Sequence, residues 1–121
     1  MVKVLIVEDD RSLQRLYELM LTTFGFEVVG KASNGKEAVD LFQSMPLRPD
    51  IILMDYRMPV KNGIEASVEI LENNSHTKII FTSADRSIAN KALSIGVTSF
   101  IEKPFVITAL HKEIERVYNE K

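Results

Sequence analysis

The chain has 121 residues, a length that allows one domain with a substantial hydrophobic core and is too short for two. Its composition is that of a globular protein, and a net charge of -2 gives no electrostatic reason to expect direct nucleic-acid binding. The absence of cysteine excludes a disulfide framework, a thiolate zinc site and a cysteine nucleophile.

The chain begins with an expected strand, Val2 to Val7, which is apolar and rich in β-branched residues. Three acids follow it directly: Glu8, Asp9 and Asp10. The run is too short for a signal peptide or a membrane span, so we expect a cytoplasmic protein without membrane insertion. A helix should run from Asp10, its N-cap, to a stop at Gly25. Its apolar stripe is Leu13, Leu16, Tyr17, Met20 and Phe24.

The same alternation continues along the rest of the chain. Residues 26–30 predict a second strand, and Asn34 opens a helix whose expected inner face is Ala38, Leu41, Phe42 and Met45. After Pro46 and Pro49, the continuous apolar run 50–54 predicts a strand covered on both faces, with Asp55 at its carboxyl end. Gly63 opens a helix with one side formed by Ile64, Ser67, Val68 and Leu71. The expected remainder is strand 78–82, helix 86–95, strand 98–101 and helix 105–118.

Five β-α units in succession, with short connections, indicate an α/β fold. Right-handed crossovers place such strands in a single parallel, doubly wound sheet with helices on both faces. Ligands of these sheets bind at the carboxyl ends of the strands. The polar residues expected there are Glu8, Asp9, Asp10, Asp55, Thr82, Ser83 and Lys103.

This set of side chains indicates phosphoryl chemistry. Closely packed carboxylates repel one another unless a divalent cation neutralises them, and oxygen ligands without His or Cys suit Mg²⁺. A remaining aspartate can attack phosphorus to form an aspartyl phosphate. Transfer of the phosphoryl group then needs mainly positioning and positive charge around its oxygens, which Mg²⁺, a lysine and a hydroxyl supply. We therefore expect Asp55 to accept a phosphoryl group.

The motifs "VEDD", "DYRMP", "TSA" and "KPF", in this order at four strand ends, resemble the receiver domains of two-component response regulators, the CheY-like family. The resemblance covers essentially the whole chain. It implies a flavodoxin-like (βα)5 fold with strand order 2-1-3-4-5. It also implies a single domain, 1–121, without an output domain, although a segment taken from a longer regulator would look the same.

The resemblance assigns roles to individual residues. Asp55 would be the phosphoacceptor, and Lys103 would pair with the phosphoryl group. Mg²⁺ would be bound by Glu8, Asp9, Asp55 and the backbone carbonyl of Arg57. Ser83 and the Ala84 N–H would hold phosphoryl oxygens, with Thr82 competing for the hydroxyl role. Ser83 and Phe100 would form the switch. The resemblance also implies a cis Lys103–Pro104 peptide, whereas X-Pro bonds in general favour trans.

The implied function is that of a phosphorylation-dependent switch and not of a catalytic enzyme. The phosphoryl donor would be a sensor histidine kinase or a histidine phosphotransfer protein, and the protein target is open. The domain would act by binding, as in chemotaxis, or pass phosphate along a relay. We expect a monomer, with dimerisation on phosphorylation as an alternative.

The same residues are also compatible with other functions. A receiver-like scaffold that no longer accepts phosphate keeps the fold. A haloacid dehalogenase-type phosphatase also uses a nucleophilic Asp, but its general acid two residues later is replaced here by Arg57. A flavin or nucleotide site is disfavoured because the acidic loop "EDDRS" would repel phosphate. Asp10 alone is typical of an N-cap, and His76 and His111 are typical of surface positions.

Overall fold

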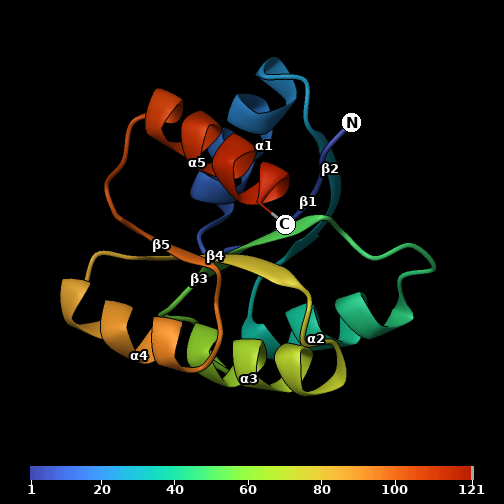
Figure 1. Ribbon diagram of the computed structural model, residues 1–121, viewed down its shortest axis with the longest axis vertical. Helices are drawn as coiled ribbons and strands as arrows, with labels where there is room; N and C mark the ends of the chain where they lie inside the picture. The colour runs from blue at the N-terminus through green and yellow to red at the C-terminus, as the bar shows by residue number, and fades with distance from the viewer. Residues whose placement is uncertain (121) are drawn as a thin grey trace.

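A parallel sheet forms the middle of the molecule. The computed structural model describes residues 1–120, and its strands are β1 (Lys3–Val7), β2 (Glu27–Ala32), β3 (Ile51–Asp55), β4 (Lys78–Ser83) and β5 (Ser99–Glu102). Their order is β2-β1-β3-β4-β5, with parallel pairing throughout (Figure 1). The flavodoxin-like order implied by the resemblance is therefore confirmed.

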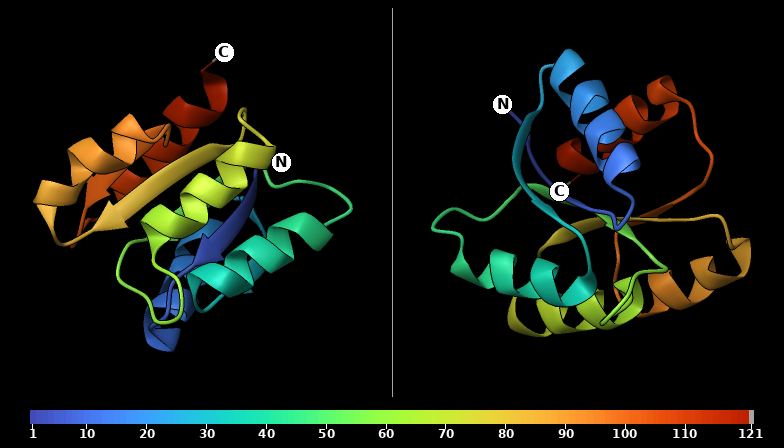
Figure 2. Two further views of the ribbon diagram at one scale, coloured as in Figure 1. Left: turned by 90° about the horizontal axis from the view of Figure 1, so that it is seen from below. Right: turned by 180° about the vertical axis from the view of Figure 1, so that it is seen from behind.

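Helices cover both faces of this sheet in two separate layers (Figures 1 and 2). The helices α1 (Arg11–Thr23) and α5 (Ile107–Asn119) lie on one face. The other face carries α2 (Gly35–Ser44), α3 (Gly63–Asn73) and α4 (Ala89–Ser94), the last preceded by the 3₁₀ turn η1 (Arg86–Ile88). Each layer has its own apolar core, one built around Leu5, Phe42 and Phe81, the other around Ile6, Leu21 and Ile114. None of the helices within residues 1–120 has the length and hydropathy needed to cross a bilayer.

Local capping explains where three of the helices begin. Asp10 accepts hydrogen bonds from the backbone N–H groups of Ser12 and Leu13, which confirms it as the N-cap of α1. Asn34 caps α2, and Asn62 forms a reciprocal capping box with Glu65 at the start of α3. These short side chains satisfy backbone donors that would otherwise lack partners.

Two predicted helix faces were partly wrong. On α1 the buried residues are Gln14, Tyr17 and Leu21, whereas Leu16 is 44% exposed. On α3 the buried residues are Gly63, Ala66, Ser67 and Ile70, a face rotated from the predicted one. Both helices carry apolar residues around much of their circumference, so periodicity alone does not select the side that meets the sheet.

Element boundaries also differ in places from the prediction. β2 and β5 begin one residue later than expected and end further on, and β4 also includes Ser83. α5 begins at Ile107 rather than at residue 105, because Val106 has an extended backbone as its N-cap. The Lys103–Pro104 peptide that precedes this turn is cis, as the resemblance implied.

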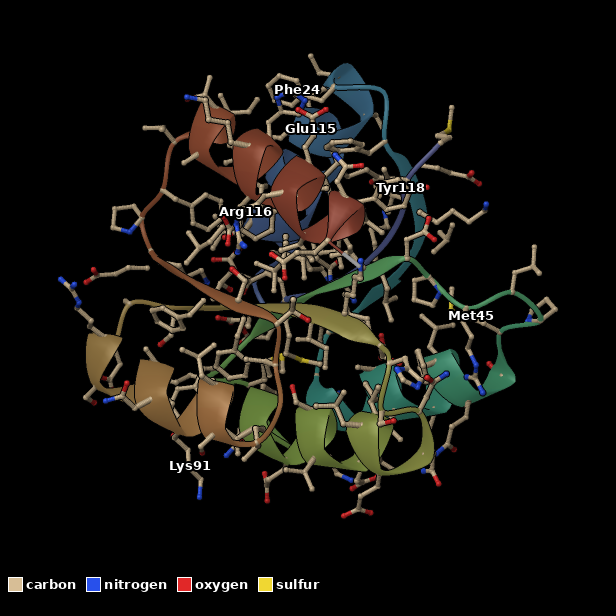
Figure 3. The ribbon with its side chains drawn as sticks, viewed as in Figure 1. Phe24, Met45, Lys91, Glu115, Arg116 and Tyr118 are labelled. Atoms are coloured by element: carbon tan, nitrogen blue, oxygen red, sulfur yellow. The ribbon has the colours of Figure 1, made fainter. Side chains whose placement is uncertain are left out.

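Side chains fill the space between the helices and the sheet (Figure 3). Phe24, next to the end of α1, stacks on the ring of His111 from α5, with ring centroids 4.0 Å apart and planes 6° apart. His111 also pairs with Glu115 at 3.3 Å and is half-buried, so it lies between two helices rather than on the open surface. Lys91 on α4, by contrast, is exposed and points away from the sheet (Figure 3).

Gly63 allows α3 to begin directly against the strand that carries Asp55. Its N–H donates to the Tyr56 carbonyl at 2.8 Å. A Cβ atom at this position would lie 2.1 Å from the Asp55 carbonyl oxygen and 3.0 Å from its carbonyl carbon. Because backbone atoms cannot move aside as a flexible side chain does, a side chain at position 63 is incompatible with this packing.

Candidate functional site

The register of the sheet gathers the predicted polar residues at one edge. Val7 pairs with Met54, so Glu8 follows at the level of Asp55. Asp55 pairs with Thr82, and Ser83 pairs with Glu102, the residue before Lys103. Residues from four strands that are far apart in sequence therefore meet at the carboxyl ends of the sheet, where such folds bind ligands.

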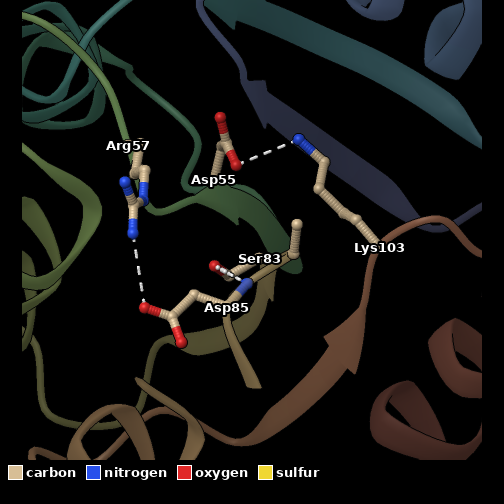
Figure 4. A pocket seen from close by; sticks show the side chains of 6 residues that line it. Asp55, Arg57, Ser83, Asp85 and Lys103 are labelled. Carbon is tan, nitrogen blue, oxygen red and sulfur yellow. Dashed lines mark hydrogen bonds and ion pairs between the residues drawn. The ribbon is translucent and has the colours of Figure 1, made fainter. Parts of the chain in front are cut away.

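A pocket of about 440 Å³ opens at this edge (Figure 4). Its lining consists of Asp55, Arg57, Ser83, Ala84, Asp85 and Lys103. They include Asp55, Ser83, Ala84 and Lys103, to which the resemblance assigned phosphoryl transfer and binding, but not the competing Thr82. The volume is ample for a phosphoryl group, and acidic, basic and hydroxyl groups all face it.

Three carboxylates cluster beside the pocket. Oxygen atoms of Glu8, Asp9 and Asp55 all lie within 4.8 Å of one another. Glu8 and Asp55 are buried, whereas Asp9 is exposed. Partial desolvation of its carboxylate, followed by the hydrogen bond and negative charge of neighbouring Glu8, raises the pKa of Asp9. The cluster thus concentrates negative charge on oxygen donors alone, and this donor set fits a hard divalent cation.

Lys103 links two of these acids. Its Nζ donates to Glu8 Oε1 at 2.8 Å and to Asp55 Oδ1 at 3.0 Å (Figure 4 shows the bond to Asp55). Burial alone would lower the pKa of Lys103, but the hydrogen bonds to Glu8 and Asp55 outweigh burial and raise it above its usual value. Lys103 therefore stays charged at neutral pH and holds the Asp55 carboxylate at the pocket.

The two candidate hydroxyl groups have different surroundings. Thr82 is buried and its Oγ1 donates to the Met54 carbonyl at 3.4 Å, inside the sheet. Ser83 lines the pocket, and its Oγ accepts a hydrogen bond from the Asp85 N–H at 2.9 Å (Figure 4). Because Ser83 only accepts in this contact, its hydroxyl hydrogen can be donated to a ligand.

An ion pair crosses the pocket. The Arg57 guanidinium lies 3.4 Å from Asp85 Oδ2 (Figure 4). Hydrogen bonds from Ser87 and the neighbouring Arg57 lower the pKa of Asp85. The Arg57 side chain is 79% exposed, so it lies at the outer side of the pocket.

Phe100 lies apart from the pocket, on β5. Its ring packs against Phe81, with centroids 6.5 Å apart and planes 22° apart, and it is half-buried. It lines a groove on the α4-β5-α5 surface together with Arg86, Leu93 and Arg116. Phe100 thus connects the core beneath β4 with this surface.

Sequence reasoning assigned no site role to Gln14 or Tyr17, both on the inner face of α1. Tyr17 lines an apolar pocket with Lys103 and stacks on Phe105 at 5.6 Å. Gln14 donates hydrogen bonds to the Glu8 carbonyl, in the loop that carries the acids, and to the Ala32 carbonyl at the end of β2. The helical spacing of Gln14, Tyr17 and Leu21 could have indicated this arrangement, because it places a glutamine and a tyrosine on the same apolar face of α1.

The burial of Tyr17 predicts a loss of stability at alkaline pH. Burial raises the pKa of Tyr17 to about 12, above its ordinary value of about 10. Between these two pH values the unfolded chain loses this proton more readily than the folded chain. We therefore expect the free energy of unfolding to fall as pH rises from about 10 to about 12, by up to about 1.4 kcal/mol per pH unit.

Urea unfolding across this pH range measures the effect. Tyr17→Phe should flatten the alkaline fall relative to the wild-type chain. Tyr118→Phe, at a 42% exposed tyrosine, is the matched control and should leave it intact. Equal slopes in all three chains would contradict the prediction.

Comparisons with known proteins agree with this geometry. Residues 4–115 match the family described as the response regulator receiver domain. The chain is 40% identical over 116 residues to the chemotaxis protein CheY of Thermotoga maritima, covering 91% of this chain and 95% of the relative. The receiver domain of the sensor histidine kinase PA1611 from Pseudomonas aeruginosa, solved with magnesium coordinated in its active-site cleft, is 31% identical, with a TM-score of 0.87. That match covers 98% of each chain.

A second solved structure extends the likeness. The CheX-CheY-BeF3-Mg complex from Borrelia burgdorferi contains a chain that superposes with a TM-score of 0.93 at 26% identity, covering 98% of this chain and 90% of that one. The acidic cluster Glu8, Asp9 and Asp55 is typical of the Mg²⁺ site of receivers. These findings confirm the predicted phosphoacceptor switch of two-component signalling, as distinct from a catalytic enzyme. The chain belongs to the response regulator receiver domain family.

Proposed function

We propose that Asp55 accepts a phosphoryl group from the phosphohistidine of a sensor histidine kinase or a histidine phosphotransfer protein. The observation that carries this assignment is the position of its carboxylate, which lines the pocket, contacts Lys103 and lies within the acidic cluster. An Asp55 oxygen forms the new O–P bond as the P–N bond of the donor breaks. The electron pair of that bond remains on the imidazole nitrogen, and with a proton on the other ring nitrogen the donor side chain leaves as neutral histidine.

The acidic cluster is the proposed Mg²⁺ site. Glu8, Asp9, Asp55 and the backbone carbonyl of Arg57 would hold the ion, directly or through water. The all-oxygen donor set and the close approach of the three carboxylates support this assignment. Bound Mg²⁺ supplies positive charge against the acids and the phosphoryl oxygens.

The remaining phosphoryl oxygens have donors of their own in this proposal. Lys103 contributes its ammonium group, Ser83 its hydroxyl and Ala84 its backbone N–H. All three residues line the pocket with Asp55, and the raised pKa keeps Lys103 charged. Donors fixed in advance around developing charge are the main contribution that proteins make to phosphoryl transfer.

Phosphorylation would change the partner-binding surface through Ser83 and Phe100. Donation by the Ser83 hydroxyl to the phosphoryl group would draw the loop after β4 toward Asp55, and Phe100 would turn inward as that loop moves. The contact of Phe100 with Phe81 and its place on the α4-β5-α5 groove support this route. Residues 1–121 would thus act as a single receiver domain that signals by protein contact, with phosphorylation shifting a two-state population.

Intact mass after incubation with acetyl phosphate and Mg²⁺ tests the assignment of Asp55. The wild-type chain should gain one phosphoryl group, and Asp55→Asn or added EDTA should abolish the gain. Asp40→Asn, at an exposed carboxylate of α2, is the matched control and should be phosphorylated normally. An unphosphorylated wild-type chain would contradict phosphate acceptance from small donors, and a phosphorylated Asp55→Asn chain would place the acceptor elsewhere.

We expect the ion pair across the pocket to slow hydrolysis of the acyl phosphate relative to a chain that lacks this pair. Arg57→Ala would open the Arg57–Asp85 contact and admit water more readily. We expect the phosphoryl group to be lost about two- to fivefold faster, the range of effects expected of an exposed ion pair. Phosphate release after removal of the donor measures the rate. Arg86→Ala removes an exposed arginine one residue beyond Asp85 and is the control; an unchanged or slower rate in Arg57→Ala would refute the prediction.

A further inference from the structure

Gln14 is a polar residue on the buried face of α1. Only 9% of its surface is exposed, and its neighbours on this face are Tyr17 and Leu21. Burying an amide is unfavourable unless its hydrogen-bonding groups find partners. The partners that Gln14 finds lie at the carboxyl end of β2 and in the loops that follow β1 and β2.

The side-chain amide of Gln14 joins the ends of these two strands. Its Nε2 donates to the Glu8 carbonyl at 2.7 Å, to the Ala32 carbonyl at 3.0 Å and lies 3.2 Å from Ser33 Oγ. The Ala32 carbonyl also accepts the Glu8 N–H at 3.0 Å. Gln14, Glu8 and Ala32 therefore form a ring of hydrogen bonds. In this ring the Glu8 carbonyl is held by Gln14 and the Glu8 N–H by Ala32.

The same backbone carries the two acids assigned to Mg²⁺. The Glu8 carboxylate accepts from Lys103 Nζ and, at 3.1 Å, from the Asp10 N–H. Asp9 lies between Glu8 and Asp10, whose carboxylate is engaged in capping α1. The peptide that leads from Glu8 to Asp9 has its carbonyl held by Gln14, so the direction of the Asp9 side chain depends on this bond.

We propose that Gln14 is a positioning residue that orients Glu8 and Asp9 and thereby sets the affinity of the site for Mg²⁺. The inference rests on the proposed function of the acidic cluster. Gln14 touches neither the ion site nor the phosphoryl group; it acts through the backbone. Residues that hold metal ligands in this way typically change metal affinity by about 10- to 100-fold when replaced.

Calorimetric titration of the chain with Mg²⁺ alone tests this role. Gln14→Met has a similar shape without the donors, and we expect its Mg²⁺ dissociation constant to rise about 10-fold. Gln14→Asn keeps the amide on a side chain that is too short to reach all three acceptors, so it should also bind Mg²⁺ more weakly. It replaces Gln14→Met in the experiment if that variant does not fold. Val39→Ala, on the buried face of α2, is the control for lost stability and should bind Mg²⁺ as the wild-type chain does.

The rate of phosphorylation by acetyl phosphate distinguishes positioning from general damage. At saturating Mg²⁺ the Gln14 variants should recover the wild-type rate, because Asp55 and Lys103 are unchanged. Unchanged affinity in folded Gln14 variants, or equal weakening in Val39→Ala, would overturn the role of Gln14 while leaving the proposed function intact. A wild-type chain that binds no Mg²⁺ would instead refute the proposed function, and the role of Gln14 with it.

Discussion

Replacing Lys103 with methionine is expected to lower the free energy of unfolding by about 3 kcal/mol in the absence of Mg²⁺. Lys103 pairs with Glu8, whose side chain is 2% exposed, and with Asp55, whose side chain is 9% exposed. Without the ammonium group two buried carboxylates would face each other uncompensated. Mg²⁺ should restore more stability to Lys103→Met than to the wild-type chain, because the cation replaces the missing charge.

Urea unfolding with EDTA and with Mg²⁺ measures both effects. Lys36→Met is the matched control: its ammonium pairs with Asp40 at 2.7 Å on the exposed face of α2, where solvent screens the pair, so stability should hardly change. Phosphorylation of Lys103→Met should be slower by about 10²-fold, the usual effect of losing one donor to developing charge. Similar stabilities of the two variants in EDTA would contradict the prediction.

Replacing Gly63 with alanine is expected to destabilise the chain by about 3 kcal/mol or more and to abolish phosphorylation. The added Cβ would overlap the Asp55 carbonyl oxygen, so α3 or the end of β3 has to move. A displaced β3 end takes the Asp55 carboxylate away from Lys103. One methyl group would therefore damage both the fold and the site.

Gly30→Ala is the matched control for this substitution. Its Cβ would meet the flexible ends of Leu41 and Leu5, at 3.0 and 3.1 Å, which can shift by a few tenths of an ångström. Its loss of stability should be smaller, about 1 kcal/mol, and phosphorylation should survive. Thermal unfolding and intact mass after acetyl phosphate compare the variants. If Gly63→Ala were as stable as Gly30→Ala and were phosphorylated as well, the close approach of position 63 to the Asp55 carbonyl would not be the constraint proposed here.

Local signals in the sequence were sufficient for much of the fold. The apolar run that ends at Asp55 predicted β3, because burial on both faces removes the usual alternation of polar residues. Asp10 and Asn34 predicted helix starts, because each caps backbone groups within three residues. The site residues could be placed together since parallel strands bring their carboxyl ends to one edge.

Features that depend on three-dimensional packing were missed. The prediction placed Leu16 in the buried stripe of α1 and did not include Gln14, whereas the structure exposes Leu16 and buries Gln14. The helix is apolar over a broad face, so its packing against the sheet decides which side is buried. The bond from Gln14 to Ala32 joins segments 18 residues apart, a relation that helical spacing cannot reveal. The close approach of Gly63 to the Asp55 carbonyl likewise depends on how α3 docks on the sheet.

The ion pair between Glu8 and Lys103 spans 95 residues of the chain. Glu8 is synthesised well before Lys103, which follows β5 in the chain. Contacts of such long sequence separation form late, after much of the chain entropy has been lost. A nascent, truncated or misfolded chain thus lacks the charge arrangement around Asp55, and a kinase would find a competent acceptor only in molecules whose folding is complete.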